Sequence, residues 1–226
     1  ITSLAFTKGE NLLHLGLAYQ MLKPDNNLIQ YAQEPETHMQ VDFVNTGDIS
    51  DVSSESIMGT ELATVIGPFS VQGEYQRATL SRNIQLSDGN ESIGKSVNHH
   101  FTSFYAYASM FLTRGDHRFY DAEDGAFSRV KPHKNFRENG GIGALELALR
   151  FSGINLNDGE ETVTEGSYSG SSLIEGGQLN NVTLGLNWYI NPNSRIMFNY
   201  VYSDLTNRDG LSGKAGFLRT RFQIDF

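Results

Sequence analysis

From Leu218 to Phe226 every second side chain except Thr220 is apolar and the residues between them are polar, and this pattern constrains the fold more than any other feature of the chain. The apolar positions end in Phe226, and the intervening positions hold Arg219, Arg221, Gln223 and Asp225. A period of two places these two sets on opposite faces of a β-strand. A soluble β-sandwich gives the same alternation. The terminal aromatic instead favours a transmembrane β-barrel of the bacterial outer membrane, because such barrels typically end in an aromatic-tipped strand.

The same reasoning predicts an all-β fold of about ten antiparallel strands. The expected strands lie at residues 2–6, 13–21, 28–44, 61–66, 69–77, 101–112, 145–151, 181–190, 195–202 and 217–226. Several reach about ten residues, which matches a tilted crossing of the bilayer and exceeds the usual length of soluble strands. We therefore expect long membrane-crossing strands with one apolar and one polar face.

Composition excludes several other classes. The apolar runs are far shorter than the roughly 18 residues of a spanning helix, and a mean hydropathy of -0.36 suits a barrel whose strands alternate between lipid and lumen. The 23 Gly, 14 Phe and 10 Tyr favour β structure. With no Cys, zinc-thiolate sites and thiol nucleophiles are excluded. The net charge of -9 argues against a nucleic-acid partner, and no cofactor is implied.

The connections between the expected strands differ in length at the two ends. If the last strand ends at the periplasm, short turns at 22–26, 67–68 and 191–193 are periplasmic. Long polar segments at 45–59, 82–97 and 155–178 are then extracellular, which is the asymmetry of outer-membrane barrels. Residues 114–140 are the exception, because parity places this long segment on the periplasmic side. The chain begins at Ile1 without an initiator Met, so we expect a processed or truncated N-terminus.

Several ordered motifs together resemble the phosphate-selective porin O and P family. They comprise residues 12–17, 66–75, 111–113, 125–132, 135–136, 140–151, 184–193 and 195–201. The resemblance implies a sixteen-stranded outer-membrane barrel that trimerises among lipid and lipopolysaccharide, with an aqueous channel. Residues 1–226 would then be the C-terminal part of a single barrel domain, with about six strands missing upstream.

Charged residues on the polar faces are candidates for the channel wall. The pore-lining candidates are Arg150, Arg195, Arg219, Arg221, Glu74 and Glu146. A cation on a pore wall lowers the barrier to anion entry, and Arg suits bidentate contacts with oxyanions. The alternative is that these arginines pair with Glu146, Glu74 or Asp225 and only brace the wall.

Two further charged regions remain open to two interpretations each. The basic turn formed by Arg129, Lys131, Lys134 and Arg137 is either an electropositive funnel or a folded turn that plugs or buttresses the mouth. The acidic positions are Asp48, Asp51, Glu55, Asp158, Glu160, Glu161 and Glu165. They either bind divalent cations that bridge lipopolysaccharide or belong to mobile, solvated loops. We predict no dedicated metal site.

These observations predict passive diffusion of small hydrophilic anions, with phosphate or a related oxyanion among them. A general, non-selective porin is one alternative, and an outer-membrane lipase or esterase is another. The second would need a Ser and a His on the outer wall, and no G-x-S-x-G motif is present. The adjacent His99 and His100 point to opposite faces of a strand. No catalytic residue is therefore predicted.

Overall fold

The protein is all-β in a computed structural model that describes residues 1–37, 39–208 and 210–225. Within these ranges the only helical element is the short 3-10 turn η1 (Glu138–Gly140). In the described part of the chain, no helix has the length and apolar character needed to cross a membrane.

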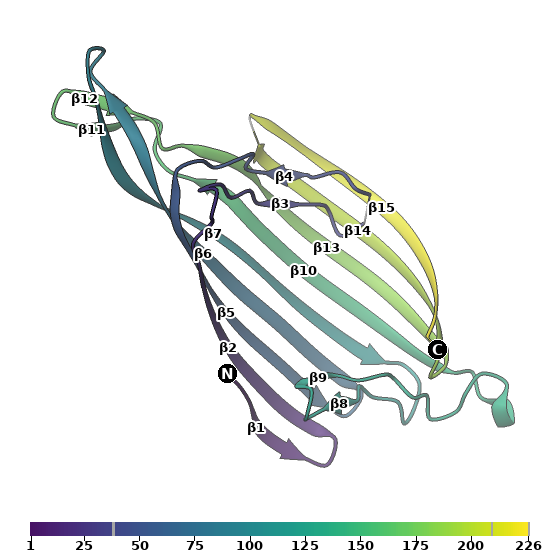
Figure 1. Ribbon diagram of the computed structural model, residues 1–226. Coiled ribbons are helices and arrows are strands. Elements are labelled where there is room, and N and C mark those ends of the chain that lie inside the picture. The colour runs from purple at the N-terminus through teal and green to yellow at the C-terminus, as the bar shows by residue number, and fades with distance from the viewer. Residues whose placement is uncertain (38, 209, 226) are drawn as a thin grey trace.

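Nine long antiparallel strands form one curved sheet in the order β1-β2-β5-β6-β7-β10-β13-β14-β15 (Figure 1). Their bounds are β1 Thr2–Lys8, β2 Asn11–Leu22, β5 Val52–Ile66, β6 Phe69–Ser87, β7 Ser92–Phe111, β10 Ala144–Asp158, β13 Ile174–Asn191, β14 Ser194–Arg208 and β15 Leu211–Ile224. Each strand pairs with the next one in this order, and the sheet is open, with β1 and β15 at its edges. The antiparallel all-β prediction is confirmed, whereas a closed barrel is not formed by these residues.

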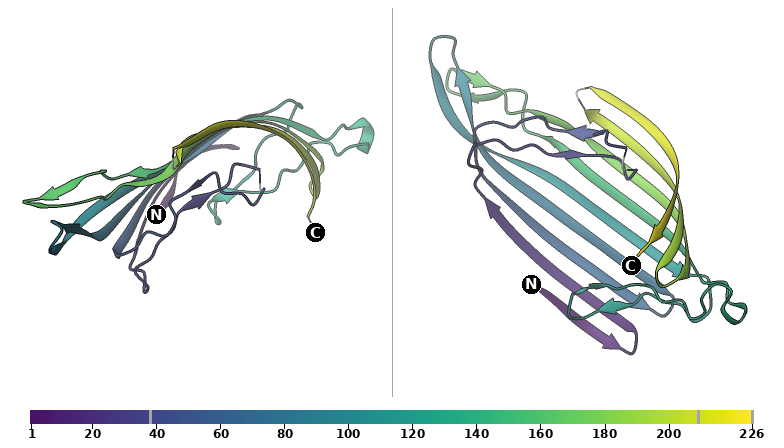
Figure 2. Two further views of the ribbon diagram at one scale, coloured as in Figure 1. Left: turned by 90° about the horizontal axis from the view of Figure 1, so that it is seen from above. Right: turned by 45° about the vertical axis from the view of Figure 1, so that its right-hand side comes forward.

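Six short strands lie in the connections between the long ones. They are β3 (Ala32–Gln33), β4 (Val44–Asn45), β8 (Tyr120–Asp121), β9 (Ala126–Phe127), β11 (Val163–Glu165) and β12 (Tyr168–Gly170). The β3–β4 hairpin lies on the concave side of the sheet (Figure 2). The β11–β12 hairpin instead joins the tip of β6, where Ser169 pairs with Ser87.

The two ends of the sheet differ in their connections. The turn end, as we call it, holds the tight connections at residues 9–10, 67–68 and 192–193, together with the end of β15. The loop end holds segments 23–51, 88–91 and 159–173. Residues 112–143 lie at the turn end, as parity predicted: His117 contacts Glu10 at 2.7 Å, and Arg129 donates to Asn193.

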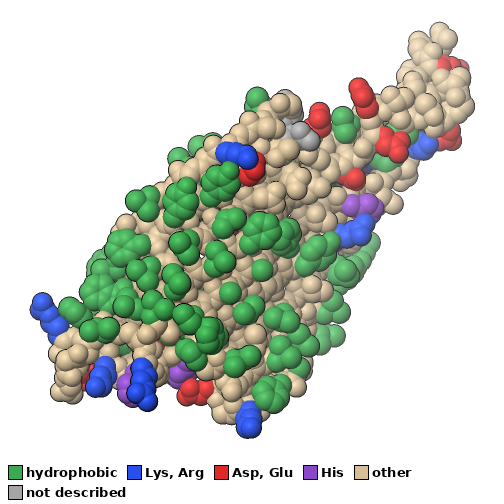
Figure 3. All heavy atoms as spheres, turned by 180° about the vertical axis from the view of Figure 1, so that it is seen from behind, with side chains coloured by type: hydrophobic (Ala, Val, Ile, Leu, Met, Phe, Trp, Pro, Cys, Tyr) green, Lys and Arg blue, Asp and Glu red, His purple; other side chains and the backbone are tan. Residues whose placement is uncertain are grey.

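The convex face of the sheet is apolar and uncovered. On β10, Leu147, Leu149 and Phe151 are exposed, and their neighbours Glu146 and Arg150 face the concave side. Figure 3 shows hydrophobic side chains spread over this face, with charged ones mainly toward its margins. In the described part of the chain, no second sheet or helix packs against this surface. The alternation predicted from the sequence therefore separates an apolar exterior from a polar interior.

Segment 23–51 is fastened to the concave face by a hydrophobic cluster. Val44 and Ile49 belong to this segment, and the sheet contributes Val52, Ala78, Leu80, Phe101, Leu156, Ile174 and Leu179. Tyr31 packs on Phe101 with ring centroids 5.1 Å apart and donates its hydroxyl hydrogen bond to Glu55. The segment is therefore part of the packed interior of the protein.

The prediction of a strand across residues 28–44 is wrong. The described residues of this region form only the short strands β3 and β4 and lie inside the curve of the sheet. Pro35 stands in its middle, and proline cannot donate to a strand ladder, so it is disfavoured in a central strand. The count is therefore nine long strands, and about seven others would complete a sixteen-stranded barrel.

Because residues 28–44 do not form a crossing strand, the prediction that residues 22–26 are a short periplasmic turn is also wrong. They lie at the start of the long connection at the loop end. The tight turn of this part of the chain is formed instead by Gly9 and Glu10, between β1 and β2. The loops predicted at 45–59 and 82–97 are largely strand, because β5 begins at Val52 and β6 and β7 pair as far as Ser87 and Ser92. The polar side chains of these two regions led to the loop prediction, because some of them face the inner segments.

A charge placed on the convex face tests its contact with lipid. Leu17 is 54% exposed on β2 among apolar neighbours, whereas the adjacent Ala18 is exposed on the opposite side and faces Gly59. We expect Leu17→Arg to lower the free energy of unfolding in lipid by about 2–4 kcal/mol, and Ala18→Arg to change it by much less. Denaturant titration of the full-length protein in vesicles measures both values. Equal losses for the two variants would contradict a lipid-facing convex surface.

Candidate functional site

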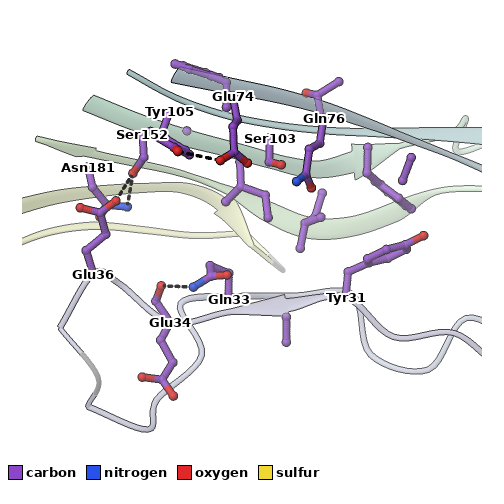
Figure 4. Close-up of a pocket in the computed structure, with 18 of the residues that line it drawn as sticks. Tyr31, Gln33, Glu34, Glu36, Glu74, Gln76, Ser103, Tyr105, Ser152 and Asn181 are labelled. Atoms are coloured by element: carbon purple, nitrogen blue, oxygen red, sulfur yellow. Dashed lines mark hydrogen bonds between the residues drawn. The ribbon is translucent and has the colours of Figure 1, made fainter. Parts of the chain in front are cut away.

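The larger cavity, of about 930 Å³, lies between segment 23–51 and the concave wall (Figure 4). Its walls come from residues 30–36 and Asp42 on one side and from β5, β6, β7, β10 and β13 on the other. Its charged lining residues are Glu34, Glu36, Asp42, Glu74 and Arg150. This part of the interior therefore carries more carboxylates than cations.

Arg150 is held by a carboxylate that the sequence did not single out. Its Nε donates to Glu36 Oε1 at 2.6 Å, and its guanidinium lies 3.9 Å from the centroid of the Tyr105 ring. Tyr105 in turn donates its hydroxyl hydrogen bond to Glu74 at 2.7 Å. The pore-lining candidates Arg150 and Glu74 therefore meet through Tyr105, but the partner of Arg150 is Glu36 from the inner segment.

Glu36 receives hydrogen bonds from two adjacent strands. Ser152 Oγ donates to Oε1 at 2.7 Å, and Thr183 Oγ1 donates to Oε2 at 2.8 Å. Arg219 Nη1 donates to the Glu36 carbonyl oxygen at 3.1 Å. Burial favours a raised pKa, but the hydrogen bonds and the positive charge of Arg150 outweigh it and hold the pKa of Glu36 below its usual range.

Glu146 anchors the other inner segment, residues 112–143. Its side chain is fully buried and accepts from Arg118 Nε and Nη2, each at 2.9 Å. Asn187 and Tyr189 also donate to it, at 2.8 and 2.9 Å. Glu146 therefore lies on the concave side of the sheet but is buried there, and its partner Arg118 was not recognised from the sequence.

A second cavity, of about 250 Å³, opens at the turn end and is basic. Arg118, Arg129 and Arg195 line it, with Asp225 as the acidic member. Arg129 donates to Asn193 Oδ1 at 2.6 Å, and Arg195 donates to Gln223 Oε1 at 2.8 Å. Because two of these arginines bond to neutral amides, their charge is not neutralised by those contacts.

The remaining candidate cations are more exposed. Arg221 shares the concave side of β15 with Arg219 and is exposed, and it forms no hydrogen bond or ion pair with the described residues. Lys131, Lys134 and Arg137 of the basic turn are exposed as well. Arg137 lies 5.2 Å from the centroid of Phe136, whose ring meets Trp188 edge-on. The basic turn is thus folded against the rim of the sheet.

Three of the seven acidic positions make contacts within the protein, whereas Asp48, Asp51, Glu160 and Glu161 are exposed. Glu55 is buried in β5, Asp158 ends β10 and accepts from the His100 backbone N–H, and Glu165 lies 3.6 Å from Lys95. Across the described residues, no three His, Asp or Glu side chains gather closely enough to hold a metal ion.

The two adjacent histidines lie in different surroundings. His99 is completely buried and stacks on Phe101, whereas His100 is exposed with Thr79 Oγ1 at 3.2 Å from its Nδ1. In the described part of the chain, neither histidine bonds to a serine hydroxyl. This geometry gives no support to the lipase or esterase alternative.

A curved antiparallel sheet with an apolar outer face and inner segments fastened to a polar face is the architecture of a porin-type channel wall. Comparison with protein families agrees: residues 2–226 match the model of the phosphate-selective porin O and P family, and the chain belongs to this family of porins.

Two relatives are similar over much of the chain. Porin O of Pseudomonas aeruginosa is 28% identical over 237 residues, which cover 96% of this chain and 50% of that protein. An uncharacterized protein of Caulobacter vibrioides is 31% identical over 153 residues, covering 66% of this chain and 28% of that protein. The chain thus spans about half the length of Porin O and less of the second relative.

Replacing the buried Glu146 by glutamine tests its role as an anchor. We expect Glu146→Gln to lower the free energy of unfolding by about 3 kcal/mol, because Arg118 would be left buried without its counter-charge. Trp188 is the only tryptophan, and its fluorescence during denaturation reports on this region because its Nε1 bonds to Ile142. Glu123→Gln, on the exposed surface of the same segment, is the control. Equal stabilities for both variants would show that Glu146 anchors nothing.

Acid should release the tip of segment 23–51, by which we mean the part that carries Glu36 and Met39. The lowered pKa of Glu36 means that docking gains stability from this group above its usual pKa of about 4.3 and loses it as pH falls through the lower folded value. A spin label on the exposed position of Met39→Cys should become more mobile in this acidic range. In Glu36→Gln the label should be mobile at every pH. If the label's mobility did not change over this pH range in the protein that keeps Glu36, the docking role of Glu36 would be contradicted.

Proposed function

We propose that this chain forms part of an outer-membrane channel through which small hydrophilic anions, phosphate and related oxyanions among them, diffuse passively. The observation that carries the proposal is the two-faced sheet: an uncovered apolar convex side and a concave side lined by polar groups. Family membership supports the same class of function. No catalytic step is part of this proposal.

The anion preference is supported by the cations of the concave side. Arg129 and Arg195 line the turn-end cavity, and Arg219 and Arg221 follow one another along the inner side of β15. Alternate residues of a strand lie about 6.5–7 Å apart, so a permeating anion passes from one guanidinium to the next. Each of them lowers the barrier to anion entry.

A general, non-selective porin remains the second candidate because one observation favours it. Glu34, Asp42 and Glu74 line the larger cavity, while its only cation among the described lining residues, Arg150, is bonded to Glu36. Carboxylates at a pore wall attract cations and oppose anions. Selectivity thus depends on which of the two cavities dominates the barrier.

We further propose that the nine strands belong to a sixteen-stranded barrel, a size that leaves an aqueous channel. The share of Porin O that the chain covers, 50%, is compatible with nine of about sixteen strands. The open edges at β1 and β15 would pair with strands outside this chain segment. The assembled protein would be a trimer in the bacterial outer membrane, in contact with lipid and lipopolysaccharide.

Electrical recording from the full-length protein in planar bilayers tests the function. We expect water-filled, ohmic channels whose reversal potential in a potassium chloride gradient shows greater permeability for chloride than for potassium. Replacing Arg129 and Arg195 together by glutamine should reduce that preference, because it removes two of the cations at the turn end. Cation preference in the unchanged protein would reject the anion proposal and favour the general porin. Absence of any channel would reject both.

A further inference from the structure

Three side chains of the sheet converge on one carboxylate from the inner segment. Arg150 and Ser152 lie on β10, and Thr183 lies on β13 directly opposite Arg150. Together they donate three hydrogen bonds of 2.6, 2.7 and 2.8 Å to the two carboxylate oxygens of Glu36. We call these three residues the wall cradle. Its donors face the concave side, where a solute would pass.

The wall cradle is held in place by contacts that do not involve Glu36. The guanidinium of Arg150 rests on Tyr105, and Tyr105 is fixed by its hydrogen bond to Glu74. Ser152 Oγ also accepts from Asn181 Nδ2 at 3.3 Å, and Asn181 Oδ1 accepts from Ser203 Oγ at 2.6 Å. Because these partners belong to the sheet, Arg150 and Ser152 keep supports of their own when the carboxylate leaves.

The segment that carries Glu36 is also attached to the sheet at places outside the wall cradle. Val44 and Ile49 bury the later part of its segment in the hydrophobic cluster, and Phe43 packs near Phe217 with ring centroids 6.2 Å apart. The tip that carries Glu36 contacts the wall through polar groups. Pro35 and Thr37 on either side of Glu36 are also buried, so releasing the tip would expose these two residues while Val44 and Ile49 keep the later part of the segment docked.

A carboxylate and a phosphate present the same kind of acceptor to these donors. Arginine and hydroxyl groups donate to either through charge-assisted hydrogen bonds, and arginine suits both anions. We propose that the wall cradle is an oxyanion-binding site of the channel and that Glu36 occupies it as an internal competitor. A permeating oxyanion binds there by displacing Glu36. This inference rests on the proposed function for its role in transport, but the binding itself is separable.

Removing the competitor tests the proposal in the full-length protein in detergent. We expect Glu36→Gln to lower the dissociation constant for inorganic phosphate, measured by calorimetric titration, by about tenfold relative to the unchanged protein. The control is Glu34→Gln, which removes the same charge from the same cavity but leaves the wall cradle occupied. It should shift the constant by less than about twofold. Combining Glu36→Gln with Arg150→Gln should abolish the gain.

Several outcomes overturn the proposal. Equal gains in Glu36→Gln and Glu34→Gln would mean that only the net charge of the cavity matters. A gain that persists without Arg150 would place the phosphate elsewhere. Unchanged affinity in a folded Glu36→Gln protein would mean that the wall cradle does not take an external anion. Folding is checked by heat-modifiable gel mobility.

A second measurement needs no change to Glu36. With the spin label at Met39→Cys, saturating phosphate at neutral pH should mobilise the tip, and chloride at equal ionic strength should not. A label at the exposed Ser50, beside the buried Ile49, should stay unaffected. If phosphate left the mobility of the label at position 39 unchanged, the proposal that phosphate competes with Glu36 would be overturned. Should the channel prove cation-selective while phosphate still mobilises the tip, the proposed function fails and the binding site stands.

Discussion

The structure depends on one constraint: every long strand has an apolar side and a polar side, and the two cannot be exchanged. In hydrocarbon, backbone donors and acceptors must be paired within the protein, so a sheet can face lipid only with its ladders satisfied and its outward side chains apolar. A slip by one residue would turn Arg150 outward and Leu149 inward. The registers on both sides of β10 are continuous through Leu149 and Arg150.

Once the outer face is given to lipid, the concave side must satisfy its own polar groups, and it does so with inner segments. Glu36 fastens one segment through Arg150, and Glu146 fastens the other through Arg118. The two pairs have opposite polarity: in the first the wall supplies the cation, and in the second it supplies the carboxylate. A charge on the wall is therefore not by itself a charge available to a solute, because its partner comes from another part of the chain.

The sequence predicted what depends on periodicity and missed what depends on distant contacts. Alternation assigned both faces of β10, β13, β14 and β15 correctly, because period two is a local property. It failed for residues 28–44, where Pro35 and polar side chains form an inner segment, and for Ser53 to Ser56, which lie within β5. Arg118 and Glu36 gave no local signal, since their charged partners lie far along the chain: Glu146 is 28 positions from Arg118, and Arg150 is 114 positions from Glu36. Only the central Pro35 pointed to an inner segment.

In the proposed channel, selectivity would depend on the barriers that these charges present to a solute. The larger cavity is acidic and lies along segment 23–51, and the smaller one is basic and lies at the turn end. In a series of barriers the highest one controls the flux, so cations at the turn end cannot confer anion preference if the acidic cavity rejects anions first. The Glu36 carboxylate matters in both respects, because it adds negative charge to that cavity and occupies Arg150 at the same time. If an anion displaces it as proposed, that anion gains the guanidinium, and the acidic cavity would be a smaller obstacle to an oxyanion than its net charge indicates.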